Sequence, residues 1–229
     1  MPFEDTKNLL IIAAHPDDEV LGCGGTMARL AAKGVAVRVI FLADGIGSRT
    51  GTTLPCEMDE RETAARAACK ILGAQPPLFG DFPDNEMDTV SRLAVTKSIE
   101  TIIGQLAPDT ILTHHAGDVN IDHRRIHDAV ITACRPQPGH PVRSLLYFEV
   151  ASSTEWQTPG SAPAFMPDTF VDISDQLSQK QAALQAYDRE MRAWPHSRSI
   201  KAITHLAHWR GATVGVDAAE AFVSGRILF

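Results

Sequence analysis

Apolar runs and amphipathic segments alternate along the chain from its beginning. The apolar residues 9–12 are bounded by polar and turn residues and predict a buried strand over residues 8–14. Apolar positions then follow a helical spacing from Glu19 to Ala32, with Gly34 as the expected C-cap. A β-branched apolar run over residues 35–42 predicts the second strand, so the chain begins with a strand–helix–strand unit.

The same alternation continues toward the C-terminus, where residues 214–223 form a further stretch without an assigned element. Strands that alternate with long helical segments are typical of βαβ units and a parallel sheet. The pattern predicts one α/β domain over residues 1–229, with a doubly wound, Rossmann-like, mostly parallel sheet and helices on both faces. The expected helices cover residues 58–72, 89–106, 122–135, 178–194 and 199–210, and the expected strands 77–79, 110–114, 145–150 and 170–173.

Composition narrows the class of protein. The 229 residues are 44% hydrophobic and 21% charged, as in ordinary globular proteins. A formal net charge of −7 without a basic run argues against a nucleic-acid partner. No apolar run approaches the roughly 18 residues of a membrane span, and the acidic N-terminus lacks a signal-peptide core. The 4 cysteines are scattered, which disfavours a disulfide framework and fits a cytoplasmic protein.

A cluster of ionisable side chains marks the end of the first expected strand. His15, Asp17 and Asp18 stand within four residues of each other, and Pro16 turns the chain away from the strand. In open α/β sheets the carboxyl ends of the strands form the edge at which ligands bind. Two carboxylates and a histidine packed so closely require a cation among them, and we expect a divalent metal ion.

A second polar cluster follows the strand expected at residues 110–114 and reaches the same edge of the sheet. His123 at the start of its helix completes a set of two histidines and one carboxylate with His15 and Asp18. Three protein ligands and an open position for water are typical of catalytic zinc, although the same set also accepts Fe²⁺, Co²⁺ or Mn²⁺. Asp17 diverges from its neighbour Asp18 and is therefore free to accept a proton from water.

Structural roles compete for several neighbouring residues. Asp118 and Asp122 are as well suited to helix capping as to catalysis. His127 lies one turn after His123, and a core or solvated histidine is a better interpretation of it than a reserve ligand. The glycine-rich residues 22–25 do not match the G-x-G-x-x-G pattern and follow carboxylates, so dinucleotide binding is not expected.

The two motifs together resemble a known family. Ala14-His15-Pro16-Asp17-Asp18-Glu19 after a first strand, with Asp122-His123 opening a later helix, is similar to the PIG-L/LmbE-like zinc-dependent N-deacetylases. The resemblance covers most of the chain in strand–helix order. It implies that His15, Asp18 and His123 hold the metal and that Asp17 is the general base.

The resemblance also implies two substrate-binding residues. Arg61 resembles the arginine that binds sugar hydroxyls, with a helix-surface ion pair as an equally good interpretation. Asp84 resembles the substrate-binding aspartate, and turn formation explains it equally well. The glycine- and threonine-rich residues 45–56 are expected to form a wall of the active site.

The second motif departs from the family pattern at one position. Many members carry His-Pro-Asp-His, whereas this chain has Asn120 at the first of these positions. An amide can donate a hydrogen bond to an oxyanion, but it cannot act as a general acid. Either Asp17 carries the proton in both directions, or His115 or His196 replaces the missing histidine. We slightly prefer His196, because the end of the chain can fold back over this edge.

The activity implied is removal of an acetyl group from a small N-acetylated amino sugar or sugar conjugate. Two alternatives stay open: a hydrolase of another amide or acyl substrate on the same scaffold, and a catalytically idle sugar- or metal-binding protein. Residues 195–229 are expected to complete the pocket or to form an interface of a homo-oligomer, with residues 227–229 as an apolar patch.

Overall fold

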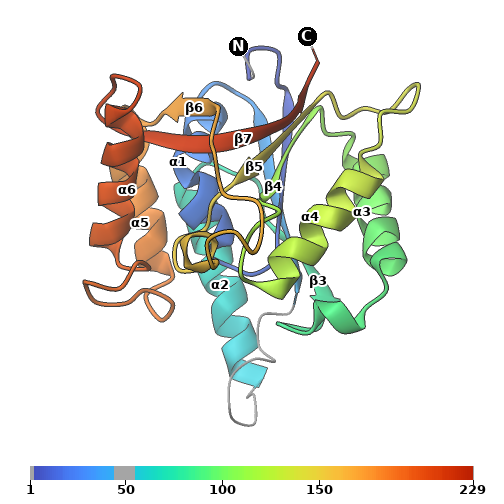
Figure 1. The fold of residues 1–229 in the computed structure, drawn as a ribbon, viewed down its shortest axis with the longest axis horizontal. Helices are drawn as coiled ribbons and strands as arrows, with labels where there is room; N and C mark the ends of the chain where they lie inside the picture. The colour runs from blue at the N-terminus through green and yellow to red at the C-terminus, as the bar shows by residue number, and fades with distance from the viewer. Residues whose placement is uncertain (1–2, 44–54, 229) are drawn as a thin grey trace.

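A computed structural model describes residues 3–43 and 55–228. Within them the chain forms a sheet of seven strands in the order β3-β2-β1-β4-β5-β7-β6 (Figure 1). The strands are β1 (Asn8–Ala13), β2 (Ala36–Ala43), β3 (Leu78–Phe82), β4 (Thr110–His114), β5 (Ser144–Phe148), β6 (Thr169–Asp172) and β7 (Ala219–Ile227). The first five in chain order pair in parallel, and β7 runs antiparallel to β5 and β6.

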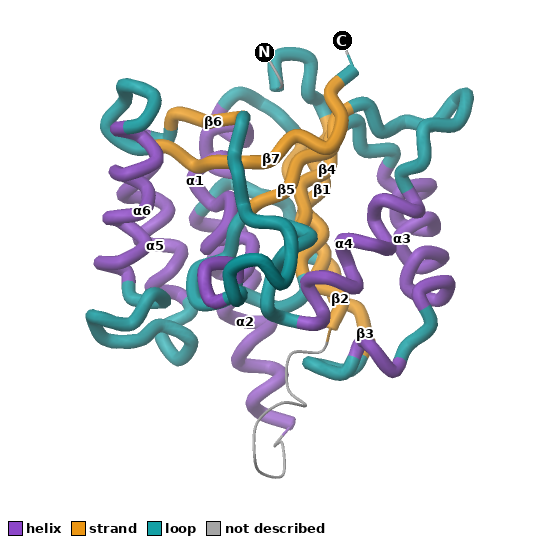
Figure 2. The backbone as a smooth tube through the Cα atoms, in the orientation of Figure 1, coloured by secondary structure: helices purple, strands orange, loops and turns teal. Residues whose placement is uncertain are grey.

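Helices cover both faces of this sheet, which confirms the predicted α/β class. In Figures 1 and 2 the strands form one band, with α3 and α4 on one side and α1, α2, α5 and α6 on the other. The helices are α1 (Asp18–Ala32), α2 (Pro55–Ile71), α3 (Arg92–Leu106), α4 (Ile121–Ala133), α5 (Leu177–Ala186) and α6 (Ile200–Ala212). Strand β1 serves both layers, because Leu9 and Ile11 join one buried apolar cluster while Leu10 and Ile12 join the other.

The sequence predicts no element over residues 214–223, whereas the structure has a nine-residue strand, β7, over Ala219–Ile227. Phe222 of this strand is fully buried and pairs with Phe148 of β5. The apolar pattern is interrupted by Ser224, Gly225 and Arg226, which hides the strand in the sequence. Ile227 therefore ends a strand of the sheet, and Leu228 after it is exposed.

The helix expected over residues 178–194 was too long, because α5 ends at Ala186. Tyr187 follows with non-helical dihedral angles, and its buried hydroxyl donates a hydrogen bond to Glu19 Oε1 at 2.7 Å. This contact turns the chain off the helix axis. Residues 187–199 consequently form a turn region at the carboxyl edge of the sheet rather than two more turns of helix.

Smaller differences concern element ends. Helix α3 begins at Arg92 rather than at residue 89, because Ser91 is its N-cap and accepts a hydrogen bond from the Ala94 amide. Strand β3 extends to Phe82. Of the wall expected over residues 45–56, residues 45–54 lie outside the described residues, and Pro55 already begins α2.

The glycines after the first motif permit close packing of α1 on its neighbours. A Cβ atom on Gly22 would lie 2.3 Å from the Phe148 ring of β5, and one on Gly25 would lie 2.7 Å from Ile173 Cδ1. These glycines are thus explained by helix packing. In residues 3–43 and 55–228, none of the helices is long and apolar enough to cross a membrane.

Candidate metal centre and active site

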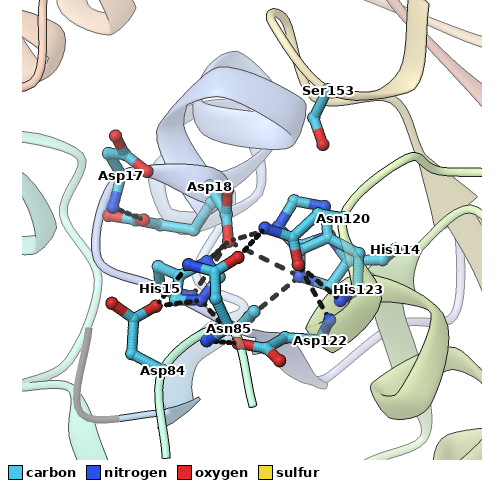
Figure 3. Close-up of polar contacts among 12 residues, drawn as sticks. His15, Asp17, Asp18, Asp84, Asn85, His114, Asn120, Asp122, His123 and Ser153 are labelled. Carbon is cyan, nitrogen blue, oxygen red and sulfur yellow. Dashed lines mark hydrogen bonds and ion pairs between the residues drawn. The ribbon is translucent and has the colours of Figure 1, made fainter. Parts of the chain in front are cut away.

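The polar clusters after β1 and β4 meet because these strands are neighbours, with Ile12 paired to Thr113. The carboxylate of Asp18 points between the rings of His15 and His123 (Figure 3). Asp18 Oδ2 lies 3.4 Å from His15 Nδ1 and 3.2 Å from His123 Nε2. The His15 amide donates to the same oxygen at 2.9 Å, which fixes the carboxylate at the helix start.

These three donor atoms fit a divalent metal ion. Asp18 and His123 are each 1% exposed, and both ring nitrogens of His123 are buried without a well-formed hydrogen bond. Ligand atoms at bond lengths of about 2.0–2.1 Å around a tetrahedral ion are separated by about 3.4 Å. The two separations from Asp18 Oδ2, 3.2 and 3.4 Å, are close to this value, and all three ligand atoms lie within 4.8 Å of one another. Two imidazoles and one carboxylate therefore form a set of the right chemistry and spacing.

Further carboxylates stand behind both histidines. His15 Nε2 lies 3.0 Å from Asp84 Oδ1 and 3.0 Å from Asp122 Oδ2. His123 Nδ1 lies 3.2 Å from Asp118 Oδ2. Metal-ligating histidines commonly donate their second ring N–H to a carboxylate, which fixes the tautomer and orients the ring. This supporting role is not among those expected for Asp118 and Asp122 from the sequence, although both residues belong to the second polar cluster.

A second group, formed by His15, Asp84 and Asp122, also brings three potential ligand atoms together. It uses the opposite nitrogen of the same histidine. Asp122 already accepts hydrogen bonds from the amides of Asn85, at 2.6 Å, and Met87, at 3.1 Å. We therefore interpret this group as the support of His15 rather than as a separate ion site.

The electrostatics of the histidines follow from these carboxylates. Burial lowers the pKa of His123, but Asp18 and Asp118 outweigh it and raise the pKa to about 9. Burial also lowers the pKa of His15. Hydrogen bonds to Asp122, Asp18 and Asp84 nevertheless hold this pKa well above its usual range. Positive charge is thus stabilised at this position, whether it comes from protons or from a metal ion.

Asp118 is fixed by the loop after β5. The hydroxyls of Ser153 and Thr154 both donate to its carboxylate, the latter at 2.7 Å. The backbone N–H of Asn120 donates to the same carboxylate at 2.8 Å. Although burial opposes ionisation, His123 and these hydroxyls hold the pKa of Asp118 well below its usual range. Asp118 is therefore an ionised buttress of His123.

Asp17 points away from the cluster of His15, Asp18 and His123 (Figure 3). Its backbone has a φ of 117°, a conformation that non-glycine residues rarely adopt, and its amide donates to Glu19 Oε2 at 3.0 Å. Asp17 as a whole residue is 2% exposed, and its Oδ2 accepts a hydrogen bond from Arg198 Nη1 at 3.0 Å. Burial raises the pKa of Asp17 to about 7, although Arg198 opposes the shift.

Sequence reasoning missed three residues around this centre. Glu19 belongs to the first motif but has no predicted role; in the structure, burial raises its pKa to about 8. Arg198 lies 181 residues from Asp17, and nothing local in the sequence indicates their contact. His114 stands at the end of β4, where its position at the sheet edge was the available signal. Its ring stacks on that of His123 with centroids 3.8 Å apart, and its Nε2 accepts from the Ala14 amide.

The two histidines suggested as replacements for the missing acid have other partners. His115 Nε2 lies 3.0 Å from the Pro163 carbonyl oxygen, and its ring packs on Phe165. His196 Nδ1 accepts from the Arg198 amide at 3.0 Å, and its ring packs on Trp156. Within residues 3–43 and 55–228, neither ring contacts the three proposed ligands.

Asn120 occupies the N-cap of α4. Its Oδ1 accepts hydrogen bonds from the amides of Asp122, at 2.8 Å, and His123, at 3.3 Å. Its Nδ2 donates to Asn85 Oδ1 at 2.9 Å. Both ends of the amide are therefore engaged, and its role toward an oxyanion stays a prediction.

The two expected substrate-binding residues are also engaged. Arg61 donates from Nη2 and Nε to Glu190 Oε1, at 2.9 and 3.2 Å. An ion pair was the alternative interpretation of Arg61, although this pair is part-buried rather than on the helix surface. Asp84 is 4% exposed, and its Oδ1 faces His15 Nε2. Binding of a substrate by either residue stays a prediction.

Comparison with known proteins gives a consistent assignment. The model of the family described as "PIG-L: GlcNAc-PI de-N-acetylase" matches residues 10–134. The diacetylchitobiose deacetylase of Thermococcus kodakarensis is 31% identical over 82% of this chain and 72% of its own length. The 4-oxalmesaconate hydratase of Pseudomonas putida is 28% identical over 95% of this chain and 86% of its own. The N,N'-diacetylchitobiose deacetylase structure from Pyrococcus horikoshii superimposes with a TM-score of 0.80 at 22% identity, covering 98% and 86% of the two chains.

Proposed function

This chain belongs to the PIG-L family, and from that premise we propose that it is a metal-dependent hydrolase that removes the acetyl group from an N-acetylated amino sugar or sugar conjugate. The observation that carries the proposal is the convergence of His15, Asp18 and His123 beside the separately held carboxylate of Asp17. A protein that only bound a sugar or a metal would have no use for that second, buried carboxylate.

We propose His15, Asp18 and His123 as the ligands of zinc or of another divalent ion. Such an ion supplies Lewis-acid chemistry, because it polarises an acyl oxygen and lowers the pKa of water. Asp118 supports this set from behind His123, and Asp84 and Asp122 support it from behind His15.

Asp17 performs the proton transfers in this proposal. It takes a proton from the attacking water as the oxygen–carbon bond forms, and it returns the proton to the amine nitrogen as the carbon–nitrogen bond breaks. The products are acetate and a free amine. The engagement of His115 with Pro163 and of His196 with Arg198 supports this two-way role over a histidine acid. A pKa of about 7 suits a group that must both accept and donate a proton near neutral pH.

The substrate class follows from the relatives. Two of them are named as deacetylases of diacetylchitobiose. A small N-acetylated sugar is therefore the first class to test, and Arg61 beside the site is the candidate for its hydroxyl groups.

One relative supports a second candidate function. The 4-oxalmesaconate hydratase matches 95% of this chain, more than the 82% matched by the Thermococcus deacetylase. Hydration also requires an activated water and a base, so the same centre would serve it with a different occupant of the pocket.

Acetate release separates these possibilities. Zinc-loaded protein is incubated with N-acetylglucosamine, N,N'-diacetylchitobiose and, separately, 4-oxalmesaconate. We expect acetate from the sugars, and its loss on chelation and in Asp17→Asn. Asp128→Asn on the same helix as His123 is the matched control and keeps the activity. Consumption of 4-oxalmesaconate without acetate release from either sugar would favour the hydratase, and bound zinc without any turnover would favour a binding protein or a different amide substrate.

A further inference from the structure

The side chain of Arg198 reaches Asp17 from a distant part of the chain. We propose that Arg198 is a positioning residue that holds the carboxylate of Asp17 in its reactive orientation, an inference that rests on the proposed role of Asp17. Arg198 Nη1 donates to Asp17 Oδ2 at 3.0 Å, and the two residues are separated by 181 positions in the sequence. The C-terminal segment thus contributes directly to the site.

The contacts of Asp17 leave its orientation to Arg198. The backbone amide of Asp17 donates a hydrogen bond to Glu19, which holds the backbone at its unusual φ of 117°. Among the described residues, its side chain has one hydrogen-bond partner, Arg198, at Oδ2. Oδ1 accepts no hydrogen bond from residues 3–43 and 55–228. One oxygen is therefore held while the other stays available for the proton.

Arg198 is itself well anchored. Its Nε donates to Ser152 Oγ at 2.9 Å, while its amide donates to His196 Nδ1 and its carbonyl accepts from the Arg192 amide. The next residue, Ser199, is the N-cap of α6, so the backbone of Arg198 is fixed to a helix start. A guanidinium offers several donors in a rigid plane, and here two of them join Asp17 to Ser152 of the loop after β5.

This geometry distinguishes Arg198 from an ordinary surface cation. The side chain is 23% exposed, and its partner Asp17 is 3% exposed. A lysine ammonium at the same place keeps the charge but cannot reproduce the planar fork that contacts Ser152 and Asp17 together. A lysine at residue 198 therefore tests the positive charge without the planar guanidinium.

The variants Arg198→Ala, Arg198→Lys and Ser152→Ala test the proposal in zinc-loaded protein, with N,N'-diacetylchitobiose as the probe. In Arg198→Ala we expect kcat to fall about 100-fold, the order of a misplaced catalytic group, with KM and zinc content near those of the wild type. We expect Arg198→Lys to recover only a small part of that loss. Ser152→Ala should lower kcat by less, because the contact to Asp17 remains.

Chemical rescue provides a readout that a purely structural role would not move. Millimolar guanidinium should restore part of the kcat of Arg198→Ala, while methylammonium at the same concentration should not. Arg189→Ala, which removes an exposed cation of the same turn, is the matched control and should keep the wild-type kcat. An Arg198→Ala variant with kcat within threefold of the wild type, or with lost activity that follows lost zinc, would overturn the proposal.

A crystal structure of Arg198→Ala decides the question independently of turnover. We expect the Asp17 carboxylate to adopt another rotamer or several, with His15, Asp18 and His123 unmoved. An Asp17 side chain in its wild-type position would refute the inference. Failure of the wild-type protein to act on the probe would instead contradict the proposed function, and the crystal structure would still test Arg198.

Discussion

The carboxylate of Asp118 lies 3.2 Å from Nδ1 of His123, on the side of the ring opposite Asp18. Asp118 is in turn held by hydroxyl groups of Ser153 and Thr154, which belong to the loop after β5. The orientation of one proposed metal ligand therefore depends on residues that lie 35 and 36 positions after Asp118 in the chain.

Asp118→Asn should weaken metal binding while it preserves the fold. The amide keeps the size of the side chain but removes the charge that orients the His123 ring, and changes of this kind typically cost about 10–100-fold in metal affinity. Competition with a chromophoric chelator measures the zinc affinity, and thermal unfolding of the metal-free protein checks the fold. Asp128→Asn in α4 is the control and should bind zinc as the wild type does. A wild-type affinity in Asp118→Asn would remove the supporting role.

Zinc binding should release at least about one proton per protein at pH 7.5. The pKa of His123 is raised to about 9, so its ring carries a proton in the metal-free protein at this pH, and the raised pKa of His15 adds to the release. Two histidines with the ordinary pKa of about 6.5 would together release only about 0.2 proton. A metal ligand must give up the proton on its coordinating nitrogen.

Zinc titration in two weak buffers of different ionisation enthalpy measures this release by calorimetry. His123→Asn should reduce the release by about one proton at concentrations that still saturate the site. A wild-type release below half a proton would contradict the electrostatic account of these two histidines.

Much of this site was accessible from sequence because its strongest signals are local. The apolar run of β1 and the His15–Asp18 motif stand next to each other, and His123 follows the next strand of the same edge. Parallel pairing of β1 with β4 then brings the two motifs together, and the structure places their donor atoms within 4.8 Å.

The rest of the site depends on contacts between distant segments. Tyr187 reaches Glu19 over 168 residues, and Arg198 reaches Asp17 over 181. Neither residue lies in a repeated or spaced motif, so periodicity carries no information about these pairs. The end of α5 and the path of residues 187–199 were mispredicted for the same reason, since the Tyr187–Glu19 contact redirects the chain there.

Glu19 should make the metal-free protein less stable as the pH rises. Its folded-state pKa is raised by burial to about 8, above the ordinary value near 4.5, so the folded state holds a proton that the unfolded state has lost. The contribution of protonated Glu19 to the free energy of unfolding is therefore fully present below about pH 4.5 and is lost progressively as the pH approaches 8. Its size is on the order of a few kcal/mol.

Glu19→Gln should remove this pH dependence. The amide mimics the protonated carboxyl group, and the Tyr187 hydroxyl can rotate to accept its N–H. Urea unfolding in the presence of a chelator, at several pH values from 5 to 8, compares the two proteins. The variant should gain stability relative to the wild type as the pH rises. A difference that stays constant with pH would show that Glu19 ionises normally in the folded protein.

Asp17 should reverse the usual order of alanine and glycine. Its φ of 117° and ψ of −28° suit glycine, whereas a Cβ atom at such a position costs about 1–3 kcal/mol. Both Asp17→Gly and Asp17→Ala remove the carboxylate, so they differ only in the backbone term. The extra freedom of glycine in the unfolded chain lowers the stability of Asp17→Gly by about 0.4–1 kcal/mol. This is less than the strain that glycine relieves, so Asp17→Gly should still be more stable than Asp17→Ala by about 1 kcal/mol. Both variants should lack activity.

Thr101 in α3 provides the matched comparison, because it is an exposed position inside a helix. There the alanine variant should be more stable than the glycine variant by about 1 kcal/mol. Urea unfolding of the four proteins in a chelator measures both differences. If glycine proved no better than alanine at position 17, the turn after Pro16 would not store strain, and the orientation of Asp17 would depend on Glu19 and Arg198 alone.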